Sequence, residues 1–441
     1  MTDLTRATAT ELSNLYQSGV ASPVTVAQQV LAKIDQLNPV LNAFCYLDPD
    51  TTLQQAQASA DRWRQGRPLS KLDGVPVAVK DSILTQGWPT LHASLTVDAE
   101  QPWTQDAPSV ARLREAGAVF VGKTTMSEFG STGHDSNSLR YGNVHNPWNL
   151  SHTPGGSSGG SAVAVAAGMV PVALGTDLGG SITVPSAFCG IFGMKPSTGR
   201  VPQWPIDVLE LSTVGPLARS MSDIALVMNT IAKPDVRDST SLPYDHAWYN
   251  SDINYSLHGK KIACVDLMKD AKILDYLTCQ GAQVDFVSLD IELSIKIFGA
   301  LLEPKLLQQW TDISKEKRHL AGRAVQRLAV LAHCQEETYL QLNKRHKLMT
   351  HMRKFMQSYD FILGPATAIT ADSALSEYVS PLSIFFCLTK QPTVTVPIGI
   401  NSDDMPQSVM IAGAMHDDLG ALQLALAIEK QFPMPACPVI L

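Results

Sequence analysis

Residues 155–182, GGSSGGSAVAVAAGMVPVALGTDLGGSI, contain the features from which the fold can be inferred. Two glycine–serine clusters, residues 155–161 and 175–181, enclose an Ala-rich segment that predicts a helix over 161–167 and an apolar segment that predicts a strand over 170–174. A flexible Gly/Ser linker would not join a buried helix and a buried strand so directly. The two clusters are therefore expected to be structured turns, and each of them ends in a serine hydroxyl.

A buried strand that ends in a lysine is predicted upstream of these clusters. The run Gly74-Val-Pro-Val-Ala-Val-Lys80 is short, apolar and β-branched. Ser22-Pro23 predicts a helix start, because Ser caps free N–H groups and Pro fits the first turn, and apolar residues recur at helical spacing from Val24 to Leu37. The other elements expected before residue 157 are a helix capped at Thr10, helices over 53–64 and 109–116, a strand over 118–122 and a long loop over 130–156.

The second half of the chain alternates strands and helices. Residues 262–265 and 284–287 predict two strands that flank a helix, after a polar, turn-rich junction over 233–259. The remaining expected elements are a mainly helical region over 301–359, strands over 393–397 and 408–411, and a closing helix over 419–431. Together these elements predict a mixed α/β architecture.

Two patterns in the helical region are interpreted as structural. A basic cluster at residues 344–347, with Arg353 and Lys354, is expected on a solvated helix face. An apolar stripe at helical spacing predicts a face that packs on the core: Leu348, Met352, Phe355 and Tyr359.

The composition disfavours several classes of protein. The 441 residues are 45% hydrophobic and have a net charge of −7, so no overall positive field favours nucleic acid. The longest apolar stretch, residues 162–174, is too short to cross a bilayer, and the N-terminus lacks the pattern of a secretory signal. Seven widely spaced cysteines predict free thiols and a cytoplasmic location. The sequence contains neither Cys-x-x-Cys nor His-Glu-x-x-His, so no metal site is expected.

The glycine–serine clusters suit an oxyanion better than a phosphate, because no Gly-Lys-Ser/Thr follows either of them. N–H groups around Gly179, Gly180 and Ser181 would stabilise the tetrahedral intermediate of acyl transfer. A serine nucleophile needs a base, and the histidines are scattered, whereas Lys80 ends a buried strand. Burial lowers the pKa of a lysine and makes it a usable base near neutral pH.

A series of ordered motifs resembles the amidase signature family over nearly the whole chain. The motifs are Gly74–Asp81, Gly122–Phe129, Asn146–Trp148, Gly155–Ala167, Gly175–Ile182, Pro185, Gly193–Pro196 and Val396–Gly399. The resemblance implies an α/β fold with a large mixed β-sheet core surrounded by helices, as a single amidase domain over residues 1–441. It also implies that this domain hydrolyses linear carboxylic amides through a covalent acyl-enzyme and uses no metal or organic cofactor. The likeness is weakest over about 235–360, and this mainly helical region is expected to vary and to shape the substrate pocket.

The resemblance also implies the roles of individual residues. Ser181 is the nucleophile, Lys80 is the base, and Ser157, after a cis peptide bond from Gly156, relays the proton between them. The oxyanion hole is formed by the backbone N–H groups of four residues: Leu178, Gly179, Gly180 and Ser181.

Two further residues, Ser158 and Asp177, are expected to support the site without reacting. The family usually has an arginine two residues after the nucleophile, where this chain has Thr183. Asp177 is therefore expected to lack its usual partner. The expected ligand is a small-molecule amide, with no nucleic acid or membrane partner and with a homodimer left open. The sequence specifies neither the acyl group nor the leaving amine, nor a preference for amides over esters.

Three alternative interpretations arise from the same residues. Residues 155–159 also match the Gly-x-Ser-x-Gly elbow of α/β-hydrolases, but a polar loop precedes them where that motif needs a strand. A glutaminase-type subunit of a tRNA-dependent amidotransferase would have the same triad. A non-catalytic binding protein with this fold would not need all three of Lys80, Ser157 and Ser181.

Overall fold

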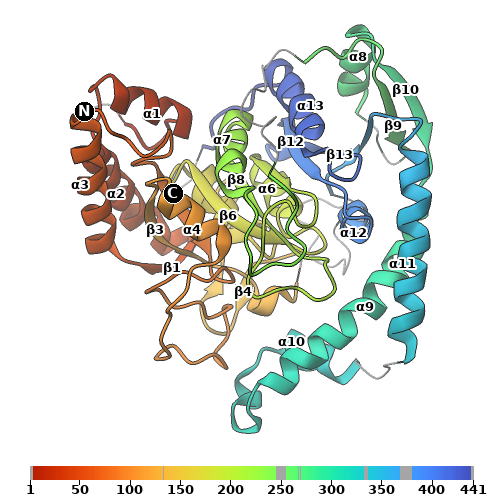
Figure 1. The fold of residues 1–441 in the computed structure, drawn as a ribbon, viewed down its shortest axis with the longest axis horizontal. Helices are drawn as coiled ribbons and strands as arrows, with labels where there is room; N and C mark the ends of the chain where they lie inside the picture. Colours follow the sequence, from red (N-terminus) through yellow and green to blue (C-terminus); the bar gives the residue numbers. More distant parts are fainter. Residues whose placement is uncertain are drawn as a thin grey trace.

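One mixed sheet of eleven strands runs through the centre of the protein, and helices surround it (Figure 1). The computed structural model describes residues 3–132, 134–244, 255–266, 268, 270–331, 336–367 and 380–438. The strands in order across the sheet are β1 (Phe44–Leu47), β3 (Val119–Thr124), β2 (Pro76–Lys80), β6 (Val172–Asp177), β8 (Thr213–Ala218), β7 (Phe192–Lys195), β12 (Thr393–Ile400), β13 (Pro406–Gly413), β11 (Phe361–Pro365), β9 (Lys261–Val265) and β10 (Gln283–Val287). The predicted α/β class with a large mixed sheet is confirmed.

Two groups of helices lie at opposite ends of the sheet (Figure 1). The first group is α1 (Ala9–Gln17), α2 (Pro23–Leu41) and α3 (Pro49–Arg64), and the second is α9 (Ile291–Asp312), α10 (Arg323–Leu331) and α11 (Glu336–Phe355). The other helices are α4 (Pro108–Glu115), α5 (Gly159–Ala166), α6 (Thr183–Cys189), α7 (Met221–Ile231), α8 (Ala271–Cys279), α12 (Pro381–Leu388) and α13 (Asp418–Gln431), with 3₁₀ turns η1 (Glu128–Gly130) and η3 (Lys315–Leu320). The long loop contains a small hairpin, β4 (Asn137–Ser138) and β5 (Gly142–Asn143).

The first helix begins earlier than predicted. Its cap is Thr8, not Thr10, because the Thr8 hydroxyl accepts from the Glu11 N–H while the Glu11 carboxylate accepts from the Thr8 N–H. This reciprocal pair requires a spacing of three residues, which Thr10 does not offer. The second helix begins as expected, with the Ser22 hydroxyl accepting from the Val24 N–H.

The interpretation of the basic cluster was wrong for Arg345. Its side chain is buried, and its guanidinium donates to the backbone oxygens of Leu388 and Glu210 at 2.9 and 3.0 Å. Five fixed N–H donors let arginine satisfy several carbonyl groups at once, which explains why this charge lies inside. The apolar stripe is confirmed as core: Leu348 and Met352 are buried, and Phe355 and Tyr359 pack on the same cluster.

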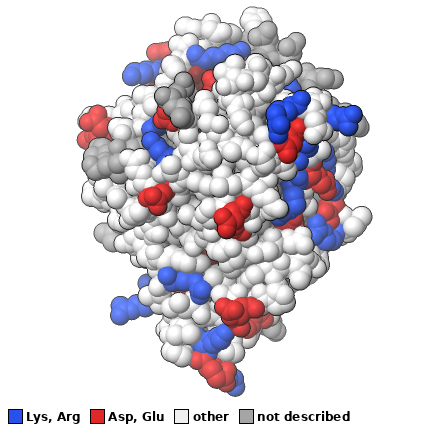
Figure 2. All heavy atoms as spheres, turned by 90° about the vertical axis from the view of Figure 1, so that its left-hand side faces the viewer, with Lys and Arg blue, Asp and Glu red and all other residues white. Residues whose placement is uncertain are grey.

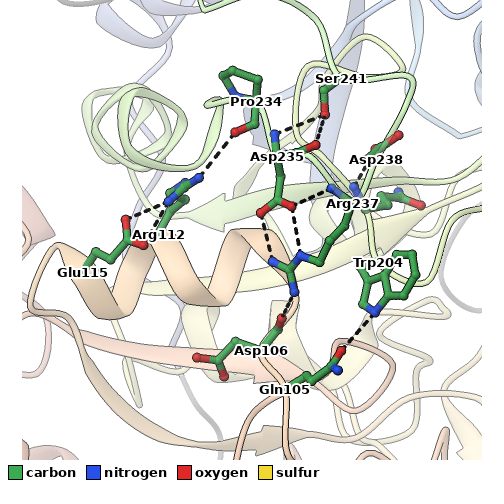
Figure 3. Close-up of polar contacts among 11 residues, drawn as sticks. Gln105, Asp106, Arg112, Glu115, Trp204, Pro234, Asp235, Arg237, Asp238 and Ser241 are labelled. Carbon is green, nitrogen blue, oxygen red and sulfur yellow. Dashed lines mark hydrogen bonds and ion pairs between the residues drawn. The ribbon is translucent and has the colours of Figure 1, made fainter.

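The strand–helix–strand unit β9–α8–β10 extends one edge of the main sheet. β9 pairs in parallel with both β10 and β11. The polar junction that precedes β9 is described as far as residue 244, and hydrogen bonds join this part of it to residues 106–112. Asp235 pairs with Arg237, which donates to the Asp106 carbonyl at 3.0 Å, and Arg112 donates to the Pro234 carbonyl at 3.3 Å (Figure 3).

The face that bears α1–α3 shows charges of both signs, with acidic side chains near its middle and a mixed group of basic and acidic side chains along one side (Figure 2). No helix within the described ranges is long and apolar enough to cross a membrane. The six cysteines within those ranges are free thiols, and Cys334 lies outside them.

Candidate active site

Two parallel neighbouring strands bring the predicted residues to one edge of the sheet. β2 ends at Lys80 and pairs in parallel with β6, which ends at Asp177. Carboxyl ends of parallel strands meet at the same edge, which is where ligands bind in open α/β sheets. The two glycine–serine clusters lie there as well, because Ser158 caps α5 and Ser181 precedes α6.

Three hydroxyl groups surround the Lys80 amine. Lys80 Nζ lies 2.7 Å from Ser157 Oγ, 2.8 Å from Ser158 Oγ and 2.9 Å from Thr176 Oγ1. The lysine side chain is fully buried, and Ser157 and Ser158 are buried beside it. The structure therefore joins the lysine and the first serine cluster as the sequence predicts.

Burial lowers the pKa of Lys80 to about 7, although the negative charge of Asp177 opposes the shift. Desolvation disfavours the ammonium form, so the amine is substantially neutral near pH 7. A neutral amine has two N–H donors and one lone pair, so one of the three hydroxyls must donate to it.

The hydrogen bonds identify the hydroxyl that donates. The Ser158 hydroxyl donates to the Thr176 carbonyl at 3.2 Å, and Thr176 Oγ1 lies 3.4 Å from Ser82 Oγ, which offers it a second partner. Within the described ranges, Ser157 Oγ has no partner other than Lys80 Nζ. Ser157 is thus the hydroxyl placed to give its proton to the lysine.

The turn before Ser181 is organised by Asp177. Its carboxylate accepts from the N–H groups of Gly180 at 2.7 Å, Ile182 at 2.7 Å and Thr183 at 3.2 Å. With Thr183 in place of the family's usual arginine, the Asp177 carboxylate is satisfied by these backbone N–H groups instead. The Gly180 N–H is therefore already engaged, and of the four expected oxyanion donors this one points to Asp177.

The two serine clusters are joined through the backbone. The Ser158 N–H donates to the Ser181 carbonyl at 3.2 Å, and the peptide bond between Gly156 and Ser157 is cis, as expected from the resemblance. Ser181 is half-buried, and its hydroxyl makes no hydrogen bond to another described residue. Gly180 has a φ of +122°, which requires glycine at the position just before Ser181.

Comparison with known proteins assigns the family. The family model "Amidase" matches residues 25–273. The chain is 34% identical over 475 aligned residues to a glutamyl-tRNA(Gln) amidotransferase subunit from Neisseria meningitidis, with 97% of this chain and 98% of that protein covered. The chain belongs to the amidase signature family.

Other members of the amidase signature family resemble the chain over different lengths. The corresponding glutamyl-tRNA(Gln) amidotransferase subunit from Chloroflexus aurantiacus is 42% identical over 264 residues, which cover 59% of this chain and 54% of that protein, so the matched region spans about half the length of that relative. A solved bacterial aryl acylamidase superposes with a TM-score of 0.88 at 26% identity, and the match covers 97% of this chain and 96% of that one.

This amidase-family site includes residues that the sequence analysis did not single out. Thr176 contributes a hydroxyl to Lys80, and it stands directly before Asp177 on β6. Phe298 of α9 and Ile384 of α12 adjoin the turn before Ser181, since a Cβ on Gly179 would lie 2.9 and 3.4 Å from their side chains. The parallel alignment of β2 and β6 is the signal that indicates Thr176, whereas α9 and α12 are too distant in sequence to be inferred.

Proposed function

We propose that the protein hydrolyses carboxylic amides through an acyl-enzyme on Ser181. The observation that supports this most is the buried Lys80 amine, with a pKa of about 7, lying 2.7 Å from Ser157 Oγ. An amine that is neutral at working pH beside a hydroxyl with no other described partner is suited to general base catalysis. Membership of the amidase signature family agrees with this assignment.

The proposed reaction begins with two proton transfers and the formation of one bond, between Ser181 Oγ and the carbonyl carbon of the substrate. Lys80 Nζ takes the Ser157 proton, Ser157 Oγ takes the Ser181 proton, and Ser181 Oγ attacks the carbonyl carbon. The carbonyl oxygen becomes an oxyanion that backbone N–H groups of residues 178–181 stabilise, with Gly180 contributing least because its N–H binds Asp177.

Breakdown of this intermediate reverses the proton path. The carbon–nitrogen bond breaks, and the leaving nitrogen takes a proton from Ser157, which regains one from the Lys80 ammonium. Water then attacks the acyl-ester through the same relay and releases the carboxylic acid and free Ser181. This sequence consumes one amide and one water and needs no metal or organic cofactor.

Several wider properties are proposed with the reaction. Residues 1–441 form one catalytic domain, and the region 235–360 shapes the substrate pocket, which the contact of Phe298 with the nucleophile turn supports. The substrate is a small-molecule amide rather than a nucleic acid or a membrane component. The free thiols of the described cysteines support a cytoplasmic location.

The test is covalent labelling combined with hydrolysis. A fluorophosphonate probe should label one peptide, the one that contains Ser181, and an amide panel should yield acid and amine. Ser181→Ala should abolish both signals, while Ser157→Ala and Lys80→Ala should each lose several orders of magnitude in rate without adding to one another. Labelling that survives Ser181→Ala contradicts the proposal, and labelling of Ser157 instead favours an α/β-hydrolase mechanism.

A second function is favoured by the relatives. Both amidotransferase relatives are, by name, single subunits of an amidotransferase, so the chain is also a candidate glutaminase-type subunit. Affinity purification from its native cells distinguishes the two functions. Stoichiometric partner subunits with glutamine as the preferred substrate support the amidotransferase role, whereas a protein that turns over other amides alone supports the free amidase. An intact protein that is neither labelled nor active on any amide supports the non-catalytic alternative.

A further inference from the structure

Helix α9 is anchored in the core near its beginning and leads from the α12 side of the sheet to α10 (Figure 1). Ile297, Phe298 and Leu301 are buried in the same apolar cluster as α12. A Cβ on Gly179, in the turn before the nucleophile, would lie 2.9 Å from the Phe298 ring. Beyond this anchor Pro304 interrupts the hydrogen-bond ladder of the helix, because proline has no N–H group to donate. Proline is a common position for a helix to bend.

The chain after Pro304 forms a tip, residues 310–325, that packs on the 3₁₀ turn η1. The apolar cluster at this contact contains four residues of the tip and, among the residues that the structure describes, one from elsewhere: Trp310, Ile313, Ala321 and Val325 with Phe129 of η1. This cluster is much smaller than the one that anchors the beginning of α9. The tip is therefore held less firmly than the base of the helix.

A hydrogen bond to a buried carboxylate also joins the tip to η1. Glu128 Oε2 accepts from the Gly322 N–H at 2.7 Å, and Glu128 Oε1 accepts from the Ser94 hydroxyl at 2.6 Å. The Glu128 side chain is buried and forms no ion pair within the described ranges. Its charge depends on these two donors, and hydrogen bonds to a charged group are among the strong ones. If the tip lifted, water could replace the Gly322 N–H as a donor, so the bond can open as well as hold.

The turn η1 adjoins the relay on its other side. It ends at Gly130, where a Cβ would lie 3.3 Å from Ser157 Oγ. Residues 291–325 thus contact the turn before Ser181 through Phe298, and they contact η1, beside Ser157, through the tip. The substrate of the proposed reaction has to reach both serines, so this segment borders the space that the substrate occupies.

We propose that residues 291–325 form a hinged lid of the active site, with Pro304 as the hinge and the Glu128–Gly322 hydrogen bond as the latch that keeps it closed. The closed lid completes the wall of the substrate site between η1 and the turn before the nucleophile. When the latch breaks, the tip lifts from η1 and the substrate loses this wall. Glu128 is a positioning residue, because it acts through the lid and takes no part in proton transfer. The effect on hydrolysis rests on the proposed function, whereas the latch can be measured without turnover.

The experiment breaks the latch from each side. Glu128→Ala removes the acceptor, and Gly322→Ala places a Cβ 2.4 Å from Glu128 Oε2, which displaces the carboxylate from the N–H group. Ser94→Ala is one control, because it removes the other partner of Glu128 and leaves the latch bond in place. Gly299→Ala is the second control, since it makes the same substitution on α9 where a Cβ would meet no neighbouring group within 4 Å.

The readouts are hydrogen–deuterium exchange of residues 310–325, kcat and KM for amide hydrolysis, and fluorophosphonate labelling of Ser181. Both latch variants should speed exchange of the tip about tenfold or more, the effect of losing one hydrogen bond to a charge. They should raise KM about threefold or more with little change in kcat, because the lost wall binds substrate and transition state alike. Labelling by the small probe should match the wild type, as should both controls in every readout. The double variant should equal either single variant, since both break one bond.

The hinge has a test of its own. Pro304→Ala restores an N–H group to the ladder of α9, so the helix resists bending. In the Gly322→Ala background it should therefore slow the exchange of the tip again. Exchange that stays as fast as in Gly322→Ala alone would show that Pro304 is not the hinge.

Other outcomes overturn the lid. Unchanged exchange of the tip in both latch variants would show that the Glu128–Gly322 bond is not a latch. Faster exchange with an unchanged KM would show that the tip does not border the substrate. Labelling of Ser181 that falls in parallel with hydrolysis would show that Glu128 acts on the relay and not through a lid. A wild type that is neither labelled nor active overturns the proposed function, and the exchange of the tip then decides the latch by itself.

Discussion

Lys80 is the residue whose protonation state should set the pH profile. Its pKa of about 7 lies far below the ordinary value of 10.5, because the ammonium form is desolvated. In the proposed mechanism the neutral amine is the reactive form, so kcat/KM should rise roughly tenfold per pH unit below an apparent pKa near 7 and then level off. That apparent pKa belongs to the coupled Lys80–Ser157–Ser181 unit. Hydrolysis rates from pH 5 to 9 measure it.

Histidine substitutions separate this base from an alternative. His152→Ala and His92→Ala should keep the rising limb, since the pKa of His92 is about 4 and its ring is already neutral over this range. Lys80→Ala should lose the limb together with most of the rate. A limb that disappeared with either histidine and survived without Lys80 would overturn the lysine mechanism.

Asp177 is the residue that holds the nucleophile turn in shape. In Asp177→Asn, the amide NH₂ replaces an oxygen that accepts from a buried N–H group, so at least one of three hydrogen bonds is lost. Hydrogen bonds to a buried charge contribute about 1.5–3 kcal/mol each to the free energy of unfolding. The variant should melt lower than the wild type and label Ser181 at least about tenfold more slowly. Asp403→Asn, at an exposed site, is the control; a variant with normal labelling and melting would remove Asp177 from this role.

Among the elements around the site, α9 and α12 pack against the turn between β6 and α6. A Cβ on Gly179 would lie 2.9 Å from the Phe298 ring, too close for both groups to keep their places. Gly179→Ala should therefore lower the hydrolysis rate by displacing the turn, at a cost of about 1–3 kcal/mol in overpacking. Phe298→Leu in the same chain should restore part of the rate, because it shortens the side chain in conflict.

A double-mutant cycle measures this contact between elements. The losses of Gly179→Ala and Phe298→Leu should not add, with a coupling energy above about 0.5 kcal/mol. Strict additivity would show that α9 does not restrain the turn.

Across the molecule as a whole, a buried ion pair joins segments 218 positions apart in sequence. Arg200, after β7, donates to the Asp418 carboxylate at the start of α13 at 3.1 Å, and Asp418 also accepts from the Ser197 N–H at 2.7 Å. Asp418→Ala removes the buried carboxylate that accepts from both Arg200 and the Ser197 N–H. Asp418→Ala should therefore lower the free energy of unfolding by about 3–5 kcal/mol, measured by chemical denaturation.

An exposed pair provides the comparison for this substitution. Glu292 and Lys296 lie one turn apart on α9, and both side chains are largely exposed. Solvent screens such a pair, so Glu292→Ala should leave the denaturation midpoint unchanged within error. Equal effects of the two substitutions on the denaturation midpoint would mean that the buried Arg200–Asp418 pair contributes no more to stability than an exposed pair.

Local patterns along the chain were enough to predict the main elements and the family. A short, apolar, β-branched run predicted β2 as a buried strand ending at Lys80, and the Ser22-Pro23 cap with helical periodicity after it predicted α2 beginning after Ser22. The glycine–serine clusters predicted structured turns, and their order along the chain was sufficient to indicate the amidase signature. Within the site, these motifs named Lys80 and Ser157, whose contact the structure shows.

Contacts between distant segments, by contrast, became visible only in the folded chain. Local patterns do not encode that Asp177 is satisfied by backbone N–H groups of its own turn, since that depends on the path of the turn rather than on the residue types. Nor do they encode that the Arg345 guanidinium donates to carbonyl groups more than forty residues away. Charge and burial in these places result from packing between distant segments, and a linear sequence contains no measure of the distance between them.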